Sequence, residues 1–228
     1  MSSKSKITFL GGGPAFHPVD QQAAAISAWL GSAYDCSVLD GAMAFDVLSS
    51  TDCFVLMGLH WSGMTADWCG NLTYNPPSES QKSAFEGYVA SGRPLVIHHG
   101  AIGSYDDWPR FGELLGFTWI WDKTSHSPIG NYSVRVLETG SALVAGITDF
   151  QIHDELYYDI HITPSLNPKV HAEADYNGKA LPMIMTAEGG RVSGAGRTVY
   201  LANGHDMEAF KCPAMKTLWT NALNWALE

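Results

Sequence analysis

The sequence predicts an α/β fold in which a mostly parallel sheet has helices on both faces and added antiparallel strands. Two observations lead to this prediction. In the first half of the 228-residue chain, short apolar runs alternate with amphipathic segments, as in the β-α-β units of parallel sheets. In the second half, extended segments follow one another with few helices between them. The length fits one sizeable domain, and we expect residues 1–228 to form it.

The first half supplies the expected parallel strands and most of the helices. We predict strands at residues 7–10, 34–39, 53–59 and 94–97, and helices at residues 20–30, 81–91 and 108–115. The run at 53–59 is unbroken and apolar, which is typical of a strand buried on both faces. Gly31 and Gly92 follow the first two helices, where glycine commonly ends a helix.

The second half supplies the antiparallel strands and a closing helix. Extended segments are predicted at residues 117–121, 132–137, 150–160, 170–176, 181–186 and 198–201. The dipeptide Asn177-Gly178 separates two of them and is a strong hairpin signal. The closing helix falls within residues 207–227, with Pro213 near its start.

The composition excludes several classes of partner. The chain is 46% hydrophobic and 16% charged, which suits a compact core, and its net charge is −10. An acidic surface repels phosphate groups, so we expect neither a nucleic acid nor an anionic membrane as partner. The N-terminal apolar run ends at Leu10 and is too short for a signal or membrane span, so we expect a cytoplasmic protein. The four cysteines form no C-x-x-C pair, which disfavours a zinc ribbon.

Histidines follow several of the predicted strands. His17 follows the first strand, His60 the third, His98 and His99 the fourth, and His205 the strand at 198–201. Ligands of open α/β sheets bind at the carboxyl ends of the parallel strands, so these side chains are expected to converge. Taken singly, each histidine could instead cap a local turn. Of the adjacent pair, we favour His99 as the pocket residue because it is nearer the loop.

An acidic pair marks the segment 150–160. Period-two alternation places Asp154 among apolar neighbours, where a lone carboxylate is costly unless it is paired or functional. A structural ion pair or backbone hydrogen bonds would equally explain Asp154. The same alternation places Glu155 on the opposite face, which could be the solvated face of an edge strand.

Aromatic and glycine-rich segments lie near the same loops. Trp61, Tyr105, Trp108, Trp119 and Trp121 could stack on sugar rings or pack as core or lid residues. The Gly11-Gly12-Gly13 loop could cradle an anion or only turn tightly, because it is not a G-x-G-x-x-G fingerprint.

Several motifs together carry a family resemblance over nearly the whole chain. They are Phe16-His17-Pro18, the segment from Gly92 to Ala101, the segment from Trp108 to Gly116, Asp154-Glu155-Leu156-Tyr157 and Gly204-His205-Asp206. With these motifs in this order, the chain resembles the trehalose-utilisation (ThuA-like) family of the class I glutamine amidotransferase-like superfamily.

The resemblance implies a flavodoxin-like core with added strands and a role in sugar metabolism, often beside oxidoreductases that make 3-keto sugars. It also implies that His205 lies near the position of the superfamily's catalytic histidine. One departure is informative, because a glutamine amidotransferase needs a cysteine at the turn after its central strand. That turn reads His98-His99-Gly100-Ala101-Ile102 here, so we expect no glutaminase chemistry.

The leading hypothesis is an enzyme that acts on a sugar or keto-sugar derivative by acid/base chemistry. His205 would be the general acid or base, Asp206 or Glu155 would orient it, and His99 would polarise a substrate oxygen. The candidate substrate-binding residues are His17, His60, Trp61, Tyr105 and Asp154.

A variant of this hypothesis adds a divalent metal, zinc or manganese, held by three of His60, His99, Glu155 and His205. The alternative from another class is a non-catalytic sugar-binding or regulatory protein on an enzyme-derived fold. In either case the expected partner is a sugar-like small molecule, and a homo-oligomer is left open.

Overall fold

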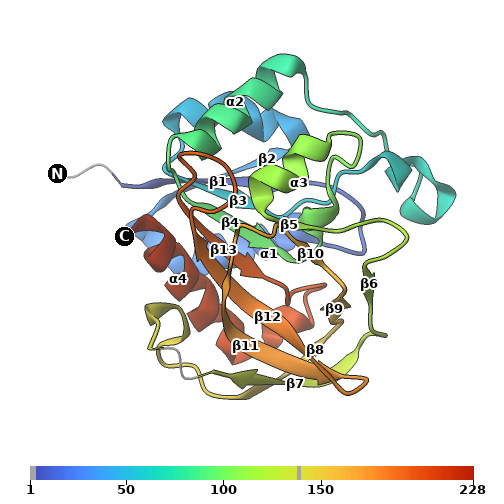
Figure 1. Ribbon diagram of the computed structural model, residues 1–228, viewed down its shortest axis with the longest axis vertical. Coiled ribbons are helices and arrows are strands. Elements are labelled where there is room, and N and C mark those ends of the chain that lie inside the picture. Colours follow the sequence, from blue (N-terminus) through green and yellow to red (C-terminus); the bar gives the residue numbers. More distant parts are fainter. Residues whose placement is uncertain (1–3, 138–139) are drawn as a thin grey trace.

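A nine-stranded sheet forms the centre of the protein, as the computed structural model of residues 4–137 and 140–228 shows (Figure 1). The strand order is β2-β1-β3-β4-β13-β12-β11-β7-β8. The first five strands in this order are parallel: β2 (Asp35–Asp40), β1 (Lys6–Gly11), β3 (Cys53–Leu56), β4 (Leu95–His98) and β13 (Arg197–Leu201). The other four pair antiparallel: β12 (Lys179–Glu188), β11 (Lys169–Tyr176), β7 (Gly130–Val136) and β8 (Phe150–Asp154). The predicted fold class is confirmed.

Helices cover both faces of the sheet. On one face, α1 (Val19–Leu30) packs beside α4 (Pro213–Leu227), and α4 lies against β3, β4 and β13. On the other face lie α2 (Glu79–Ala90), α3 (Pro109–Leu115) and the 3₁₀ segment η2 (Gly41–Ser50), where Phe45 and Phe85 pack against Phe54 of β3. A capping box between Ser78 and Gln81 begins α2 by satisfying backbone groups at its first turn.

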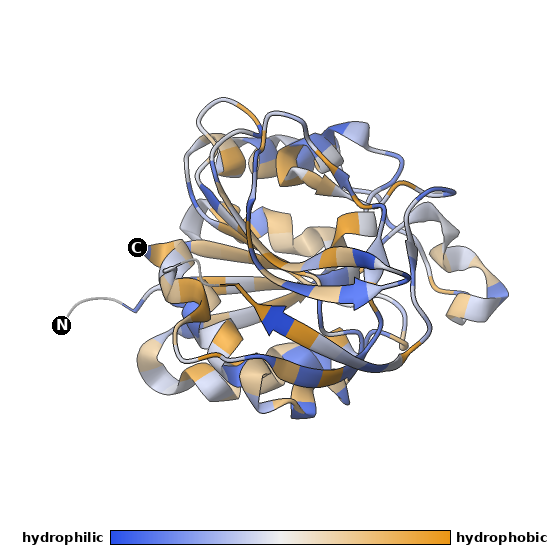
Figure 2. Ribbon diagram, turned by 60° about the horizontal axis from the view of Figure 1, so that its bottom comes forward, coloured by the Kyte–Doolittle hydropathy of each residue, from blue (hydrophilic) through white to orange (hydrophobic). Residues whose placement is uncertain are grey.

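The burial pattern explains why the two halves of the sequence differ. The described residues of β3 and β4 are buried throughout, as expected for strands covered on both faces. The outer strand β7 alternates between exposed positions and partly or fully buried ones, because only one of its faces is covered. Figure 2 shows this contrast between the hydrophobic central strands and the mixed outer ones.

Two small sheets lie beside the large one. β5 (Phe117–Thr118) pairs with β10 (His161–Ile162), and β6 (Ser125–His126) pairs with β9 (Tyr157–Tyr158). These short pairings hold the loops of the second half close to the edge of the large sheet where the parallel strands end.

Some of the sequence-based boundaries need correction. The predicted strands 53–59 and 117–121 stop at Leu56 and Thr118. The closing helix lies within the predicted range and begins at Pro213, after the short 3₁₀ segment η7 (Ala209–Lys211). The predicted strand 150–160 is interrupted, since the backbone N–H of Leu156 donates to Ser127 Oγ rather than to a neighbouring strand. The period-two alternation fails at this break, so Asp154 and Glu155 are both buried.

Among the described residues, no helix is both long enough and apolar enough to cross a membrane.

Candidate functional site

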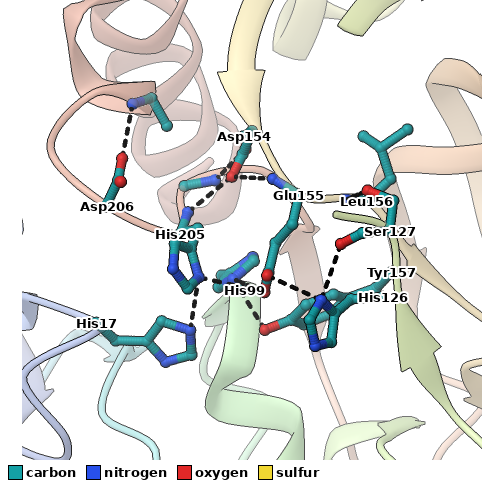
Figure 3. A network of polar contacts seen from close by, with 12 residues as sticks. His17, His99, His126, Ser127, Asp154, Glu155, Leu156, Tyr157, His205 and Asp206 are labelled. Carbon is teal, nitrogen blue, oxygen red and sulfur yellow. Dashed lines mark hydrogen bonds and ion pairs between the residues drawn. The ribbon is translucent and has the colours of Figure 1, made fainter. Parts of the chain in front are cut away.

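Four loops bring three histidines and a glutamate together at one edge of the large sheet (Figure 3). His17 follows β1, His99 follows β4 and His205 follows β13, so these three stand at carboxyl ends of parallel strands. Glu155 follows β8, whose direction matches that of β13 after four antiparallel pairings. One nitrogen or oxygen atom from each of the four lies within 4.8 Å of the others. We call these four residues the histidine–glutamate cluster.

His99 is held in one orientation by the backbone. Its φ of 41° lies in the left-handed region, where the chain turns out of β4 and directs the imidazole into the cluster. His99 Nδ1 lies 2.7 Å from the carbonyl oxygen of Ala202, which can only accept, so Nδ1 carries the proton. The lone pair of Nε2 in the neutral ring therefore faces the cluster, and the Tyr157 hydroxyl donates to it at 2.8 Å.

Glu155 is the only carboxylate in the cluster and is 4% exposed. Its Oε1 lies 3.3 Å from His99 Nε2 and 3.2 Å from His205 Nδ1, while its Oε2 lies 3.0 Å from His126 Nδ1. Burial alone would raise the pKa of Glu155. The hydrogen bonds from His126 and His205 outweigh burial and hold the pKa of Glu155 well below its usual range, so the side chain is ionised.

The histidines around this carboxylate differ in their electrostatics. Burial and the neighbouring His99 and His205 lower the pKa of His17 well below its usual value. Burial acts against the charged form of His205 too, but its bond to Glu155 outweighs burial and raises the pKa. His17 Nε2 and His205 Nδ1 lie only 3.1 Å apart. The cluster thus combines a neutral imidazole and an anionic carboxylate within reach of one point.

The distances in the cluster fit a divalent cation. A metal held tetrahedrally by imidazole nitrogen and carboxylate oxygen at about 2.0–2.2 Å has neighbouring ligand atoms separated by about 3.3–3.6 Å. The contacts of 3.1, 3.2 and 3.3 Å lie at or slightly below this separation, and the four potential ligand atoms all lie within 4.8 Å of one another. The bond from His99 Nδ1 to a carbonyl is the kind of supporting contact that orients a metal-bound histidine. His17, His99, Glu155 and His205 are therefore the residues that could hold a metal.

Asp154 fixes the loops that carry the cluster. Its two carboxylate oxygens accept hydrogen bonds from the backbone N–H groups of Glu155, Gly204 and His205, at 2.7–3.0 Å, and from the Asn203 side chain at 3.1 Å. Asp154 therefore ties the end of β8 to the loop after β13. It supports the cluster from behind, with both of its oxygens occupied by these bonds.

Gly204 in this loop has no room for a side chain. Its φ is 123°, a value that glycine tolerates and other residues rarely adopt, and a Cβ there would lie 2.2 Å from Cε1 of His98. The Gly204 carbonyl accepts from Gln22 Nε2 at 2.7 Å and lies 3.1 Å from His98 Nε2. His98 therefore packs beneath the loop, and His99 is the member of the pair that enters the cluster.

A cavity of about 500 Å³ opens over the cluster. Its polar side chains are His17, His126, Glu155, Tyr157 and His205. The rest of its wall is apolar. Trp61, Trp119 and Trp121 were expected near these loops from the sequence, and they are joined by Phe16, Leu59, Trp68, Gly100, Gly103 and Ile129. The arrangement offers a polar end for chemistry and an aromatic end for binding.

Three other sequence candidates lie outside the cluster. The ring of His60 stacks on Tyr105, its Nε2 lies 2.8 Å from the Gly11 carbonyl, and Tyr105 is itself 1% exposed in the core. The group of residues that could hold a metal therefore contains His17 in place of the expected His60. Asp206 accepts from the backbone N–H groups of Glu208 and Ala209, and Figure 3 shows its carboxylate turned away from the cluster.

Two residues of the site were not identified from the sequence as candidates. Tyr157 belongs to the Asp154–Tyr157 motif but reaches His99 only because β8 breaks before it. His126 lies on the two-residue strand β6, too short for a periodic signal, and its bond to Glu155 raises its pKa. Only the three-dimensional pairing of β6 with β9 brings His126 to the carboxylate.

A comparison with protein families identifies the family of this chain. Residues 11–226 match the family model named ThuA, described as trehalose utilisation. The chain belongs to the ThuA family. Membership implies a role in trehalose utilisation at the level of the family's description, and it confirms the resemblance seen in the sequence. A search of curated proteins found no match.

Solved structures agree on the fold of this ThuA-family protein. A ThuA-like protein of Parabacteroides merdae has a TM-score of 0.75 at 17% identity, covering 99% of this chain and 90% of that one. A ThuA-like protein of Bacteroides uniformis has a TM-score of 0.71 at 18% identity, covering 98% and 90%. A glutamine amidotransferase of Thermotoga maritima has a TM-score of 0.52 at 9% identity, with both chains fully covered. The fold is thus ThuA-like and amidotransferase-like.

Proposed function

We propose that this ThuA-family protein is an enzyme of sugar metabolism. It binds a divalent cation, zinc or manganese, in the histidine–glutamate cluster and transfers protons on a sugar or keto-sugar derivative. The observation that carries the proposal is the convergence of four potential ligand atoms within 4.8 Å beneath a cavity of about 500 Å³.

The protonation pattern supports a cation at this point. Because His99 donates through Nδ1 to a carbonyl, its Nε2 carries no proton, yet this atom lies 3.3 Å from the carboxylate oxygen of Glu155. Two electron-rich atoms at this distance repel each other unless a proton or a cation lies between them. His17 and His205 add two further nitrogens, 3.1 Å apart, to the same space. A divalent cation would satisfy all four side chains at once.

The residues around the cavity have different roles in the proposed reaction. A bound cation would polarise a carbonyl or hydroxyl oxygen of the substrate. Tyr157 and His126 place a hydroxyl and an imidazole beside the cluster, as groups that hold or move a proton at the substrate. Trp61 and the other apolar wall residues exclude water from that end of the cavity.

Turnover of candidate substrates tests this function directly. Protein loaded with zinc or with manganese is incubated with a panel of keto-glucosides, before and after chelation, alongside His99→Ala and Glu155→Gln. We expect turnover that disappears on chelation and falls at least 10²-fold in both variants, since positioned acid/base and metal groups contribute effects of this size. His153→Ala is the matched control, because His153 bonds to Asn131 on the exposed outer strands and should retain full activity.

Turnover that survives chelation and both substitutions would contradict the proposal. Binding of a keto-glucoside without turnover, in the presence of either metal, would favour the non-catalytic sugar-binding alternative.

A further inference from the structure

Five aromatic side chains surround the mouth of the cavity above the histidine–glutamate cluster. We call them the aromatic collar: Phe16, Trp61, Trp68, Trp119 and Trp121. They come from the loops after β1, β3 and β5. Each touches the next: Phe16 stacks on Trp68, Trp68 packs on Trp61, Trp61 stacks on Trp121, and Trp121 packs on Trp119, with ring centroids 5.4–6.1 Å apart.

The collar joins the polar end of the site on both sides. The Phe16 ring is stacked near His205, with centroids 6.4 Å apart, and Trp119 meets the edge of Tyr157 at 4.9 Å. A ligand that reaches the cluster therefore passes between these rings. The collar and the cluster form one continuous binding site with two chemically different ends.

Most of the exposed large hydrophobic side chains among the described residues line this cavity. Of the described large hydrophobic side chains, six are exposed, and four of these line the cavity: Phe16, Trp68, Trp121 and Ile129. Trp68 is 69% exposed, an unusual state for tryptophan unless it meets a ligand or partner. Because the surface is hollowed and leads to the cluster, a small molecule fits it better than a flat protein face does.

The chemistry of the wall narrows the class of ligand. None of the described lining residues is Lys or Arg, so the wall away from the cluster and His126 offers no cationic side chain to a phosphate or carboxylate group. Away from the cluster, the wall consists of aromatic rings, Leu59, Ile129, Gly100 and Gly103. A second sugar ring carries many hydroxyl groups that such a wall cannot satisfy, whereas a flat apolar group gains from both burial and stacking.

We propose that the substrate is an uncharged glycoside whose aglycone is a flat, apolar ring, held by the aromatic collar. This inference rests on the proposed function for its sugar part, which lies on the histidine–glutamate cluster. The aglycone stacks on the exposed rings of Trp68 and Trp121 at the mouth of the cavity, and Trp61 supports both rings from behind.

Binding of simple glycosides tests the inference without knowledge of the reaction. Dissociation constants of phenyl α- and β-D-glucopyranoside, the two methyl glucopyranosides and trehalose are measured by calorimetry on the full chain. We expect the better phenyl glucoside to bind at least about tenfold more tightly than its methyl counterpart and than trehalose, since stacking and burial of one ring act together. Trp68→Ala and Trp121→Ala should each reduce the phenyl-to-methyl ratio several-fold.

Met43→Ala is the matched control. Met43 is another exposed apolar side chain, 55% exposed, and lies outside this cavity, so the variant should keep the ratio. Trehalose binding as tightly as the phenyl glucosides, a ratio unchanged in both tryptophan variants, or no binding of either phenyl glucoside would each overturn the inference. So would a dimer in sedimentation experiments that dissociates in Trp68→Ala, because the collar would then be an interface between copies.

The same assay separates this inference from the proposed function. Glu155→Gln alters the cluster and should weaken both glucosides alike, so their ratio survives. If wild-type protein binds no metal but prefers the phenyl glucosides, the proposed function fails and the collar assignment stands. If metal binds in the cluster but no aryl preference is found, only the collar assignment fails.

Discussion

His126 contacts the carboxylate of Glu155 through the oxygen that faces away from the other histidines. Its Nδ1 lies 3.0 Å from Glu155 Oε2 and 2.9 Å from the carbonyl oxygen of Ser127. The hydrogen bonds of this ring to other described residues use Nδ1, so Nε2 remains for the substrate. His126 also lines the cavity, which gives it access to a bound ligand.

A substitution at His126 therefore separates proton transfer from metal binding. We expect His126→Gln to retain the metal, since His126 is not among the four clustered ligands, and to lose turnover by about 10²–10⁴. Steady-state kinetics and metal content are measured on the same preparation. Turnover within a few-fold of wild type would remove His126 from the chemistry.

At the scale of the elements, the position of the cluster depends on how β8 is fastened to the loop after β13. Asp154 makes this connection through three backbone N–H groups and one side-chain amide, all in a buried setting. Hydrogen bonds to a buried charged acceptor are among the stronger ones in proteins, and leaving a buried N–H unpaired adds a desolvation cost.

Replacement of Asp154 should thus cost both stability and site geometry. Asp154→Asn keeps one acceptor oxygen and loses the other, so we expect destabilisation of about 2–4 kcal/mol in urea denaturation and weaker metal binding. Asp206→Asn is the matched control, because Asp206 also accepts from two backbone N–H groups but outside the buried core. An equal loss of unfolding free energy in Asp154→Asn and Asp206→Asn would show that Asp154 has no special role in joining β8 to the loop after β13.

The antiparallel half of the sheet contains a buried histidine that should make stability depend on pH. His171 Nε2 of β11 lies 2.7 Å from Thr186 Oγ1 of β12. Burial is the main cause that lowers the pKa of His171 to about 4, and the nearby charge of Lys169 lowers it further. In the unfolded chain the pKa of histidine is about 6.5, so between pH of about 6.5 and 4 the unfolded state binds a proton at His171 that the folded state does not bind. Stability is therefore complete above pH of about 6.5 and is lost as the pH falls towards 4.

The corresponding experiment is denaturation in urea between pH 7 and 4. We expect His171 to contribute at most about 3 kcal/mol to the loss of stability over this interval. His171→Asn should flatten the pH dependence, whereas His161→Asn, at an exposed position of β10, should leave it unchanged. A wild-type profile identical to that of His171→Asn would contradict the assignment.

At the scale of the whole molecule, the order of strands does most to create the site. The parallel half brings the loops with His17, His99 and His205 to one edge, and the antiparallel half returns a strand in the same direction to add Glu155. The alternation of apolar runs and helices was enough to predict the sheet, and the rule about carboxyl ends was enough to predict where histidines gather. Those two features depend on local patterns that a sequence displays.

The membership of the cluster depends on features that local patterns do not display. His17 and His60 both follow parallel strands, but His60 turns to the Gly11 carbonyl while His17 meets His205. Glu155 is buried because β8 ends one residue earlier, which period-two alternation cannot anticipate. Both outcomes are decided by loop conformation and by contacts between residues far apart in the chain.

Metal content is the measurement that tests the central claim most directly. Plasma mass spectrometry is applied to freshly purified wild-type protein, to His205→Ala and to Glu155→Gln, with His153→Ala as control. We predict close to one zinc or manganese ion per chain in wild type and control, and a clear loss in the two cluster variants. Metal-free wild-type protein that also fails to bind added zinc or manganese would contradict the account, as would equal metal content in all four proteins.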